Sequence, residues 1–351
     1  QSQQLSLAIE LIQEGKQSYD QGKFTAAASS ILEAVKIYQV AGQKLEQIQT
    51  LSLLSLIYEK LGQRQQVEET QSSCLSLLKK VPDSNDRDRV HAQVLNRKGR
   101  WQLSRGDAKA AIATAQRAES LYTQLDNSTG KIGSQINQAQ AWQALGFYRR
   151  AENILTSVEQ ELRAQKPSPI KISSLQNLGN LLRQKGDLKR SEQILAESLT
   201  LAKNLNLSNE ISQILLDLGN NKHDLALITS KIQNENQSRV YYQQALKYYQ
   251  QAQHRATVPL TIIKAQLNQL SIYIETKQLS SGKNIIWSIS EKLSQLAPSR
   301  ESIYIRINFA QNLMQLESEL DIVSILNTAI EHAEYLHDLR AESYALGTLG
   351  Q

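Results

Sequence analysis

Five glycines recur at a nearly constant interval, and this period constrains the fold more than any other feature of the sequence. Successive members lie 40, 44, 40 and 40 residues apart. Helix-forming residues precede and follow each one, as in WQLSRGDAKAA and LRQKGDLKRSE. Each segment therefore predicts a helix, a tight turn and a second helix, and the period predicts a chain of such units. The five glycines are Gly22, Gly62, Gly106, Gly146 and Gly186.

A second set of small residues accompanies the turn glycines. One precedes each turn by seven positions, and further small or modest residues follow it by five and twelve positions. A glycine inside a helix costs about 1 kcal/mol relative to alanine, so Gly179 needs a structural reason. We expect the two helices of each pair to approach closely at these positions. The residues before the turns are Gly15, Ser55, Gly99, Ala139 and Gly179.

The positions of the prolines support the same division into repeats. All five fall between the expected second helix of one repeat and the first helix of the next, where a helix has to break. We therefore predict an all-α fold over residues 1–351, a single right-handed superhelical α-solenoid of antiparallel helix pairs. The sixth repeat is expected to have a lengthened first helix and a turn near residues 234–236. The expected repeats are 3–42, 44–80, 88–124, 131–165, 170–204, 208–254, 259–296 and 300–336, with a partial repeat at 338–351.

This pattern resembles the tetratricopeptide repeat. Gly179, Gly186, Leu188, Leu195 and Ser198 match that family's positions 8, 15, 17, 24 and 27. The family's usual period is about 34 residues, whereas the period here is 40. The segments INQAQAWQALGFYRRAENIL (136–155) and QNLGNLLRQKGD (176–187) are most similar to the long repeats that precede the caspase-like CHAT domain of cyanobacterial proteins. The resemblance implies an interaction region that controls an effector peptidase domain.

The first helices of stacked repeats line a concave face. Helical spacing predicts that positions 5, 9 and 12 of each first helix point into this groove. Amides there offer donors and acceptors, and arginine suits a carboxylate, so we predict that the groove binds a peptide backbone or an acidic segment. The alternative is that these are only solvated polar positions. The predicted partner-binding residues are Asn96, Arg100, Gln140, Gln143, Gln176, Asn180, Arg183, Asn220 and His223.

One known groove chemistry is not expected here. Some tetratricopeptide proteins hold a C-terminal carboxylate with lysine, asparagine and arginine side chains from adjacent repeats. No neighbouring set in this chain reproduces that clamp, so the chaperone-tail function does not transfer. Position 9 of the first six repeats reads Lys16, Leu56, Arg100, Gln140, Asn180 and Asn220.

The sequence shows no arrangement typical of catalysis or metal binding. The histidines are scattered, and His332 and His337 are five residues apart, on different faces of a helix. The single cysteine, Cys74, occupies a small-residue position and is interpreted as a buried structural thiol. No glycine-rich phosphate loop occurs. Glu317 and Glu319 are interpreted as solvated residues of a turn. We therefore predict a protein that is not an enzyme and has no cofactor or metal.

Charge and hydropathy exclude further classes of function. The net charge of +5 is spread over 351 residues, so no nucleic-acid partner is expected. No apolar run is long enough to suggest a membrane span. Short basic clusters at residues 97–100, 149–150 and 189–190 are interpreted as solvated helix surface, with a patch for an acidic partner as the alternative.

The predicted function is a non-catalytic scaffold that binds a protein or peptide partner and regulates an effector domain. One alternative is a sensor region for a peptide or small ligand. Another is a self-assembly module, which would make this chain a monomer or an end-to-end dimer. The chain begins at Gln1 and stops inside an expected helix, so it is interpreted as a fragment of a longer, soluble protein. Either the cytoplasm or export to the periplasm or cell envelope fits this sequence.

Overall fold

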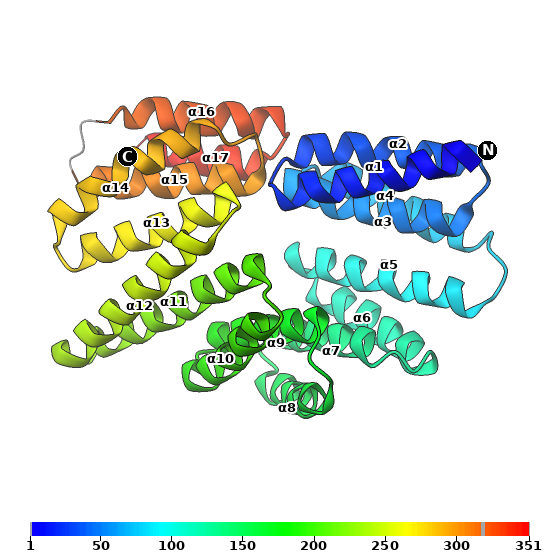
Figure 1. The fold of residues 1–351 in the computed structure, drawn as a ribbon, viewed down its shortest axis with the longest axis horizontal. Coiled ribbons are helices and arrows are strands. Elements are labelled where there is room, and N and C mark those ends of the chain that lie inside the picture. Colours follow the sequence, from blue (N-terminus) through cyan, green and yellow to red (C-terminus); the bar gives the residue numbers. More distant parts are fainter. Residues whose placement is uncertain (1, 317–319, 351) are drawn as a thin grey trace. The chain divides into compact units, whose positions relative to one another are not determined.

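The computed structural model describes residues 2–316 and 320–350, and every regular element in these ranges is an α-helix. The contact pattern divides the chain into an N-terminal unit, residues 1–166, and a C-terminal unit, residues 167–351. Within each unit, consecutive helices pack side by side in antiparallel pairs (Figure 1). The predicted all-α class is confirmed. Glu317 and Glu319, which were interpreted as solvated, lie outside the described residues.

The N-terminal unit contains four helix pairs. Within each pair, a short turn joins a first helix to a second helix of similar length. The helices are α1 (Ser2–Asp20), α2 (Phe24–Val40), α3 (Lys44–Leu61), α4 (Arg64–Leu78), α5 (Asn85–Ser104), α6 (Ala108–Gln124), α7 (Ser128–Ala144) and α8 (Tyr148–Ala164).

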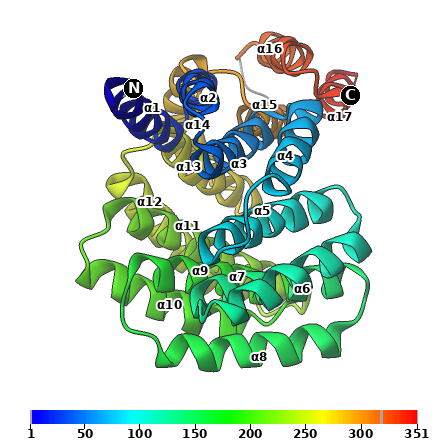
Figure 2. The ribbon, with the colours of Figure 1, turned by 90° about the vertical axis from the view of Figure 1, so that its right-hand side faces the viewer.

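The C-terminal unit continues the pattern, with one pair of greater length. Its α11 has 24 residues, against 17 in α9, and packs along α12 (Figure 2). The turn between them covers residues 232–234, slightly earlier than the sequence suggests. The helices are α9 (Pro169–Lys185), α10 (Leu188–Asn204), α11 (Ser208–Lys231), α12 (Glu235–Arg255), α13 (Pro259–Glu275), α14 (Leu279–Ser294), α15 (Arg300–Gln315), α16 (Ile322–Tyr335) and α17 (Leu339–Leu349).

From α1 to α14, the turn within each helix pair includes a residue in the left-handed backbone conformation. Gly186 ends α9 with φ of +89°, and its N–H donates to the carbonyl of Arg183 over 2.9 Å. The N–H of Asp187 donates to Leu182 over 2.9 Å, which completes the usual glycine stop of a helix. The pair α13 and α14 has no glycine at this place, and Lys277 takes the left-handed conformation there with φ of +58°. The same turn geometry therefore persists where the sequence signal fails.

Gly179 marks the closest approach of α9 to α10. A Cβ atom at this position would lie 2.6 Å from Cγ of Leu195 and 3.5 Å from the carbonyl oxygen of Ser191. Real Cβ atoms do not come so close to another carbon, so a larger residue would force the Leu195 side chain out of its place. Leu195 fills the space that the missing side chain leaves, and it is fully buried.

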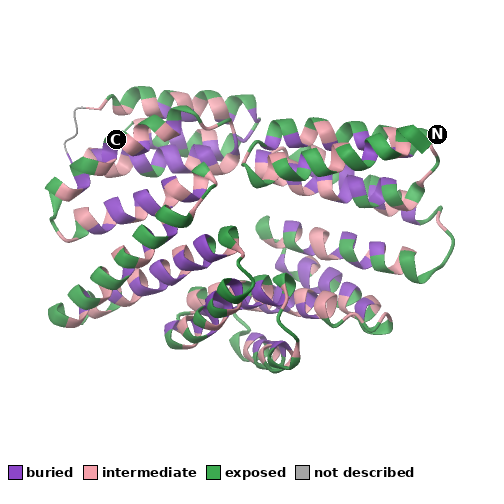
Figure 3. Ribbon diagram, viewed as in Figure 1, coloured by how far each residue is buried: buried purple, intermediate pink, exposed green. Residues whose placement is uncertain are grey.

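The core of each unit follows the seams between neighbouring helices. Buried residues line the faces that helices turn toward each other, while the outer faces are exposed (Figure 3). One cluster joins residues of α9, α10, α11, α12 and α13, and a second joins α13, α14 and α15. Because each helix buries its apolar side against its neighbours, stability in such a stack depends on contacts between adjacent repeats.

Cys74 is buried in the N-terminal unit, with 1% of its surface exposed. Its thiol lies 3.6 Å from the carbonyl oxygen of Ile48, and burial raises its pKa to about 12. Since the thiolate is the reactive form, we expect maleimide labelling of the folded protein at pH 7.5 to be far slower than labelling in denaturant. Mass spectrometry of a labelling time course measures this. Labelling that is equally fast in the folded protein would contradict the buried placement.

A buried arginine caps the C-terminal end of α14. Arg306 of α15 is 3% exposed and donates to the carbonyl oxygen of Leu293 over 2.6 Å. It also donates to the carbonyls of Leu296 and Ser302, over 3.4 and 3.3 Å. Desolvation lowers the pKa of Arg306 to about 10, so the side chain is still charged at neutral pH. Its donors thus add charged hydrogen bonds to carbonyls at the end of α14 and in the first turn of α15.

His332 of α16 makes the stability of the C-terminal unit depend on pH. Burial first, and then the charge of Arg306, lowers the pKa of His332 from 6.5 to about 4. Between pH 6.5 and 4, the unfolded chain therefore protonates His332 while the folded chain keeps it neutral. The free energy of unfolding thus falls as the pH drops from 6.5 toward 4. We expect the urea midpoint of the wild type to drop more between pH 7.5 and 4.5 than that of His332→Gln. Equal drops would show that His332 does not contribute.

Candidate functional site

A groove of about 620 Å³ lies along the first helices of the C-terminal unit. It extends from the end of α9 across α11 and α13 to α15. Only three of its lining side chains, Leu216, Leu267 and Ile305, are apolar. The polar ones are Arg183, Asp217, Asn220, His223, Asp224, Lys264, Asn268, Ser271, Asn308, Gln311 and Asn312.

Helical periodicity places these side chains together. On α11 the polar lining residues are 217, 220, 223 and 224, which are spaced by three or four residues and so share one face. The opposite face of α11 carries Leu215 and Leu218, which are buried in the core. The groove lining of α11 is therefore on the side of this helix that faces away from Leu215 and Leu218.

Asp217 of α11 receives two hydrogen bonds from α9. Nε2 of Gln176 donates to Oδ2 of Asp217 over 2.6 Å, and Nδ2 of Asn180 donates to the same oxygen over 3.0 Å. Burial raises the pKa of Asp217, while these two bonds and the charges of Arg183 and Lys264 act in the opposite direction. The two amides thus hold a desolvated carboxylate in a fixed orientation.

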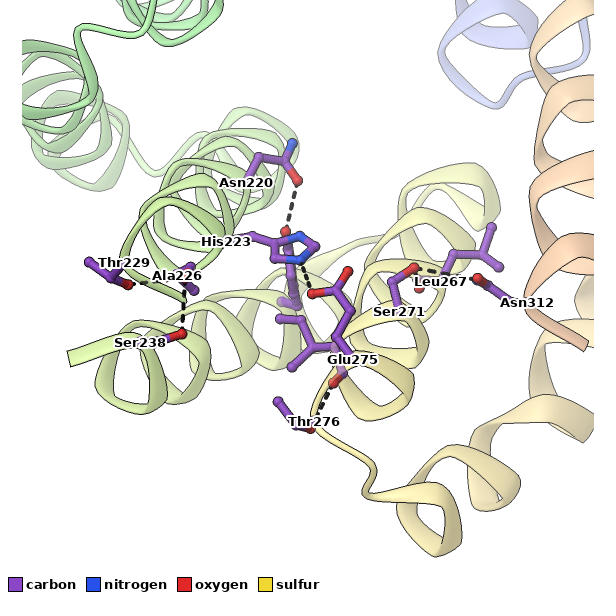
Figure 4. A network of polar contacts seen from close by, with 12 residues as sticks. Asn220, His223, Ala226, Thr229, Ser238, Leu267, Ser271, Glu275, Thr276 and Asn312 are labelled. Carbon is purple, nitrogen blue, oxygen red and sulfur yellow. Dashed lines mark hydrogen bonds and ion pairs between the residues drawn. The ribbon is translucent and has the colours of Figure 1, made fainter. Parts of the chain in front are cut away.

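The other ionisable groups at the groove are paired with each other. Nη1 of Arg183 lies 2.6 Å from Oδ2 of Asp224. Nε2 of His223 lies 2.8 Å from Oε2 of Glu275 (Figure 4). Lys264 pairs with Glu301 at the start of α15. These pairs connect neighbouring first helices and neutralise most of the groove's charge.

Amide groups make up the centre of the groove. Oδ1 of Asn220 accepts from the hydroxyl of Tyr249 and from Nδ2 of Asn268, each over 2.9 Å. Tyr249 is completely buried on the second helix α12, and burial raises its pKa, so it stays a neutral donor. Farther along, Nδ2 of Asn312 donates to Ser271 over 3.4 Å (Figure 4). Asn308 is exposed beside them. The first helices α11, α13 and α15 thus each place at least one asparagine side chain along the groove.

Five of the nine predicted binding residues belong to this region. Arg183, Asn220 and His223 line the groove, whereas Gln176 and Asn180 lie behind it and bond to Asp217. The guanidinium of Arg183, which the sequence offered for a carboxylate ligand, is already engaged by Asp224. The geometry therefore favours a peptide backbone over an acidic segment, and the binding role itself stays a prediction.

The other four predicted residues belong to the N-terminal unit and do not line that groove. Oδ1 of Asn96 accepts from the hydroxyl of Ser134 over 2.8 Å and from Asn137 over 3.3 Å, so it connects α5 to α7. Arg100 is exposed, and Gln140 and Gln143 are half-buried.

A cavity of the N-terminal unit lies elsewhere, between α4 and α5. Its volume is about 390 Å³, and its lining includes Leu75, Lys98, Trp101 and Arg105. Trp101 is 6% exposed, and its Nε1 has no hydrogen-bond partner. Asn96, Arg100, Gln140 and Gln143 do not line this cavity.

The basic clusters are partly engaged within the chain. Nη1 of Arg97 donates to Ser52 over 3.0 Å, and the guanidinium of Arg150 lies 4.7 Å from the ring centre of Trp142. Arg190 pairs with Asp187 over 3.7 Å. One arginine of each basic cluster therefore makes a contact within the chain.

The structure adds groove residues that are not among the nine predicted binding residues, notably Asp217, Asp224, Lys264, Asn268 and Asn312. A signal for some of them exists in the sequence. Several side-chain bonds between first helices join residues that are 41 positions apart, one more than the repeat period. A search for polar pairs at that separation would have found them.

Comparison with known proteins agrees with this architecture. Residues 172–207 match the family model of the tetratricopeptide repeat, and this segment covers most of α9 and all of α10. The chain thus has an all-α, tetratricopeptide-like repeat fold. It has no significant match among curated protein sequences.

Three solved structures resemble the whole chain. One is a Rap protein in complex with Competence and Sporulation Factor, with a TM-score of 0.54, 11% identity, and coverage of 97% of this chain and 96% of that one. The second is the quorum sensor NprR from B. thuringiensis in its apo form, with a TM-score of 0.51, 15% identity, and coverage of 93% and 87%. The third is IFIT1 with Gppp-AAAA, with a TM-score of 0.56, 14% identity, and coverage of 96% and 75%. At such identities the likeness is one of fold.

Residues 2–316 and 320–350 hold no group of three or more histidine, cysteine, aspartate or glutamate side chains placed to bind a metal ion. None of the described helices has the length and apolar character of a membrane span.

Proposed function

We propose that the groove of the C-terminal unit binds an extended polypeptide segment, and that the chain is a non-catalytic protein-interaction region. The observation that carries this proposal is the series of amides on α11, α13 and α15 that line one groove. Asn268, Asn308 and Asn312 each retain hydrogen-bonding groups that no described residue uses. An extended backbone presents N–H and C=O groups that such amides can pair with.

Charge argues for a polypeptide over a nucleic acid. The arginine and lysine of the groove are held by Asp224 and Glu301, and Asp217 adds a further carboxylate. Phosphates bind where free basic groups gather, and carboxylates repel them. The resemblance in fold to a Rap protein complexed with Competence and Sporulation Factor, and to a quorum sensor, is in keeping with a peptide ligand.

The test uses the whole chain and a positional-scanning mixture of nine-residue peptides, acetylated and amidated at their ends, with binding measured by fluorescence anisotropy. We expect saturable binding that falls by about tenfold or more in the double variant Asn268→Ala, Asn312→Ala. Asn327→Ala, at an exposed position on the second helix α16, is the matched control and is expected to bind normally. Absence of saturable binding, or equal binding by both variants, would overturn the proposal.

The resemblance of residues 136–155 and 176–187 to CHAT-associated repeats suggests what such a groove would regulate. In this proposal ligand binding alters the activity of a caspase-like domain attached to the same protein. The full-length sequence on either side of these residues is the first test. If it encodes such a domain, peptidase activity is expected to change on addition of a groove-binding peptide.

Self-assembly is a second candidate, because apolar side chains are exposed on α16 and α17. Tyr335 is 62% exposed, Leu339 is 77% exposed and Leu346 is 48% exposed. Adjacent exposed apolar residues favour contacts with another molecule. Sedimentation velocity over a hundredfold range of concentration tests this candidate, and a monomer at every concentration would eliminate it.

A further inference from the structure

Asp217 is the charged group of the groove that lacks an oppositely charged partner. Among the described lining residues, Asp224 contacts Arg183 over 2.6 Å, and Lys264 contacts Glu301. Asp217 contacts only the amides of Gln176 and Asn180. Arg183 and Lys264 influence it at a distance without bonding to it. The groove therefore contains one carboxylate whose charge is not balanced by contact.

Oδ1 of Asp217 is an acceptor that no described residue uses. Both amide bonds end on Oδ2, so Oδ1 accepts no hydrogen bond from any described residue. Asp217 lines the groove, whereas Asn180, whose Oδ1 is also buried without a described partner, lies behind it. Oδ1 of Asp217 is therefore the acceptor that an N–H group of a ligand can reach.

Partial burial makes an unbalanced carboxylate costly for the free protein. Desolvation is the largest influence on Asp217 and raises its pKa. A cation that enters the groove would offset this cost, because a charged hydrogen bond in a desolvated site is stronger than one in water. The same argument disfavours an acidic ligand segment at this point.

We infer that the groove recognises a cationic group of its ligand at Asp217, the ammonium or guanidinium of a peptide. This inference rests on the proposed function, because the amides of α13 and α15 hold the backbone while Asp217 selects the charge. The cation comes either from a lysine or arginine side chain or from a free N-terminal amine. Oδ2, which accepts from Gln176 and Asn180, fixes the orientation of Asp217, and Oδ1 receives the ligand.

The experiment measures the charge preference of the whole chain with two peptide sets. The first set is acetylated and amidated, and scans lysine, arginine, norleucine, glutamine and glutamate at each of nine positions. The second set has free N-termini. We expect one position to favour lysine or arginine over norleucine by about tenfold or more in the first set, or a free amine to give the same gain in the second.

Two variants test whether the preference for a cationic residue depends on Asp217. Asp217→Asn keeps the size and the acceptor for Gln176 and Asn180 but removes the charge, and it is expected to abolish the preference. Glu210→Gln removes one negative charge seven residues earlier on α11, outside the groove lining, and is expected to retain the preference. Circular dichroism confirms that each variant is folded. If Asp217→Asn does not fold, carbodiimide coupling of a bound lysine peptide to the wild type, mapped by mass spectrometry, is expected to identify Asp217.

The outcomes separate the inference from the proposed function. Peptide binding without any cationic preference, or an equal preference in Asp217→Asn, would refute the inference and leave the peptide groove standing. Coupling of a lysine peptide to another carboxylate would also refute it. Absence of all peptide binding would overturn both.

Discussion

Gly179→Ala is expected to destabilise the protein by about 2 kcal/mol, although alanine is the better helix former. The new Cβ would lie 2.6 Å from Cγ of Leu195, too close for this fully buried side chain to keep its place. Leu195→Ala alone is expected to cost about 3 kcal/mol, since it leaves a cavity at a fully buried position. In the double variant, truncation of Leu195 makes room for the new Cβ at position 179, and that Cβ fills part of the cavity. We expect it to be more stable than the sum of the single effects by about 1 kcal/mol or more.

Urea denaturation followed by circular dichroism gives the free energies of unfolding for this cycle. Gln184→Ala, at an exposed position on α9, is the control and is expected to change stability by less than about 0.5 kcal/mol. Strictly additive single and double variants would show that Gly179 is not the contact point of the pair.

Arg306→Met is expected to destabilise the C-terminal unit by about 3 kcal/mol. Methionine approximates the volume of the aliphatic stem but donates no hydrogen bond. The carbonyls of Leu293, Leu296 and Ser302 would each lose a charged hydrogen bond in a buried region. Bonds from a charged donor are worth more than neutral ones, so their joint loss is costly.

Hydrogen exchange resolved by mass spectrometry locates this effect as well as measuring it. We expect faster exchange in peptides from α14 and α15 of Arg306→Met, with unchanged exchange in α1 and α2. Arg340→Met, an exposed arginine of α17, is the control and is expected to leave exchange unchanged. A fully stable Arg306→Met protein would mean that water replaces the lost donors.

Much of the fold could be predicted because local and packing signals agree. Gly186 specifies a left-handed turn, Gly179 specifies a close helix contact, and both recur with the period of the repeat. Lys277 shows the limit of this reasoning. It adopts the same turn conformation without being glycine, because the packing of α13 on α14 imposes the turn on a residue that does not favour it.

The candidate site was harder to predict, because helical spacing tells which face a residue occupies but not which partner it finds. Arg183 lies in the groove as expected, yet a carboxylate from the next repeat occupies its guanidinium. Tyr249 donates a hydrogen bond to Asn220 from a second helix, whereas all predicted binding residues lie on first helices. Its long side chain reaches under Gly219 to Asn220, a contact that no one-dimensional pattern encodes.

The long α11 and α12 hairpin has a consequence for how such proteins change over evolutionary time. Asn220 and Asn268 are bonded across 48 residues, whereas comparable bonds elsewhere span 41. The seven additional residues amount to about two helical turns and preserve the face of each helix. Insertions at the far tip of a hairpin can therefore accumulate in descendants without disturbing the surface that meets the ligand. Related chains could diverge in hairpin length while inheriting the same specificity.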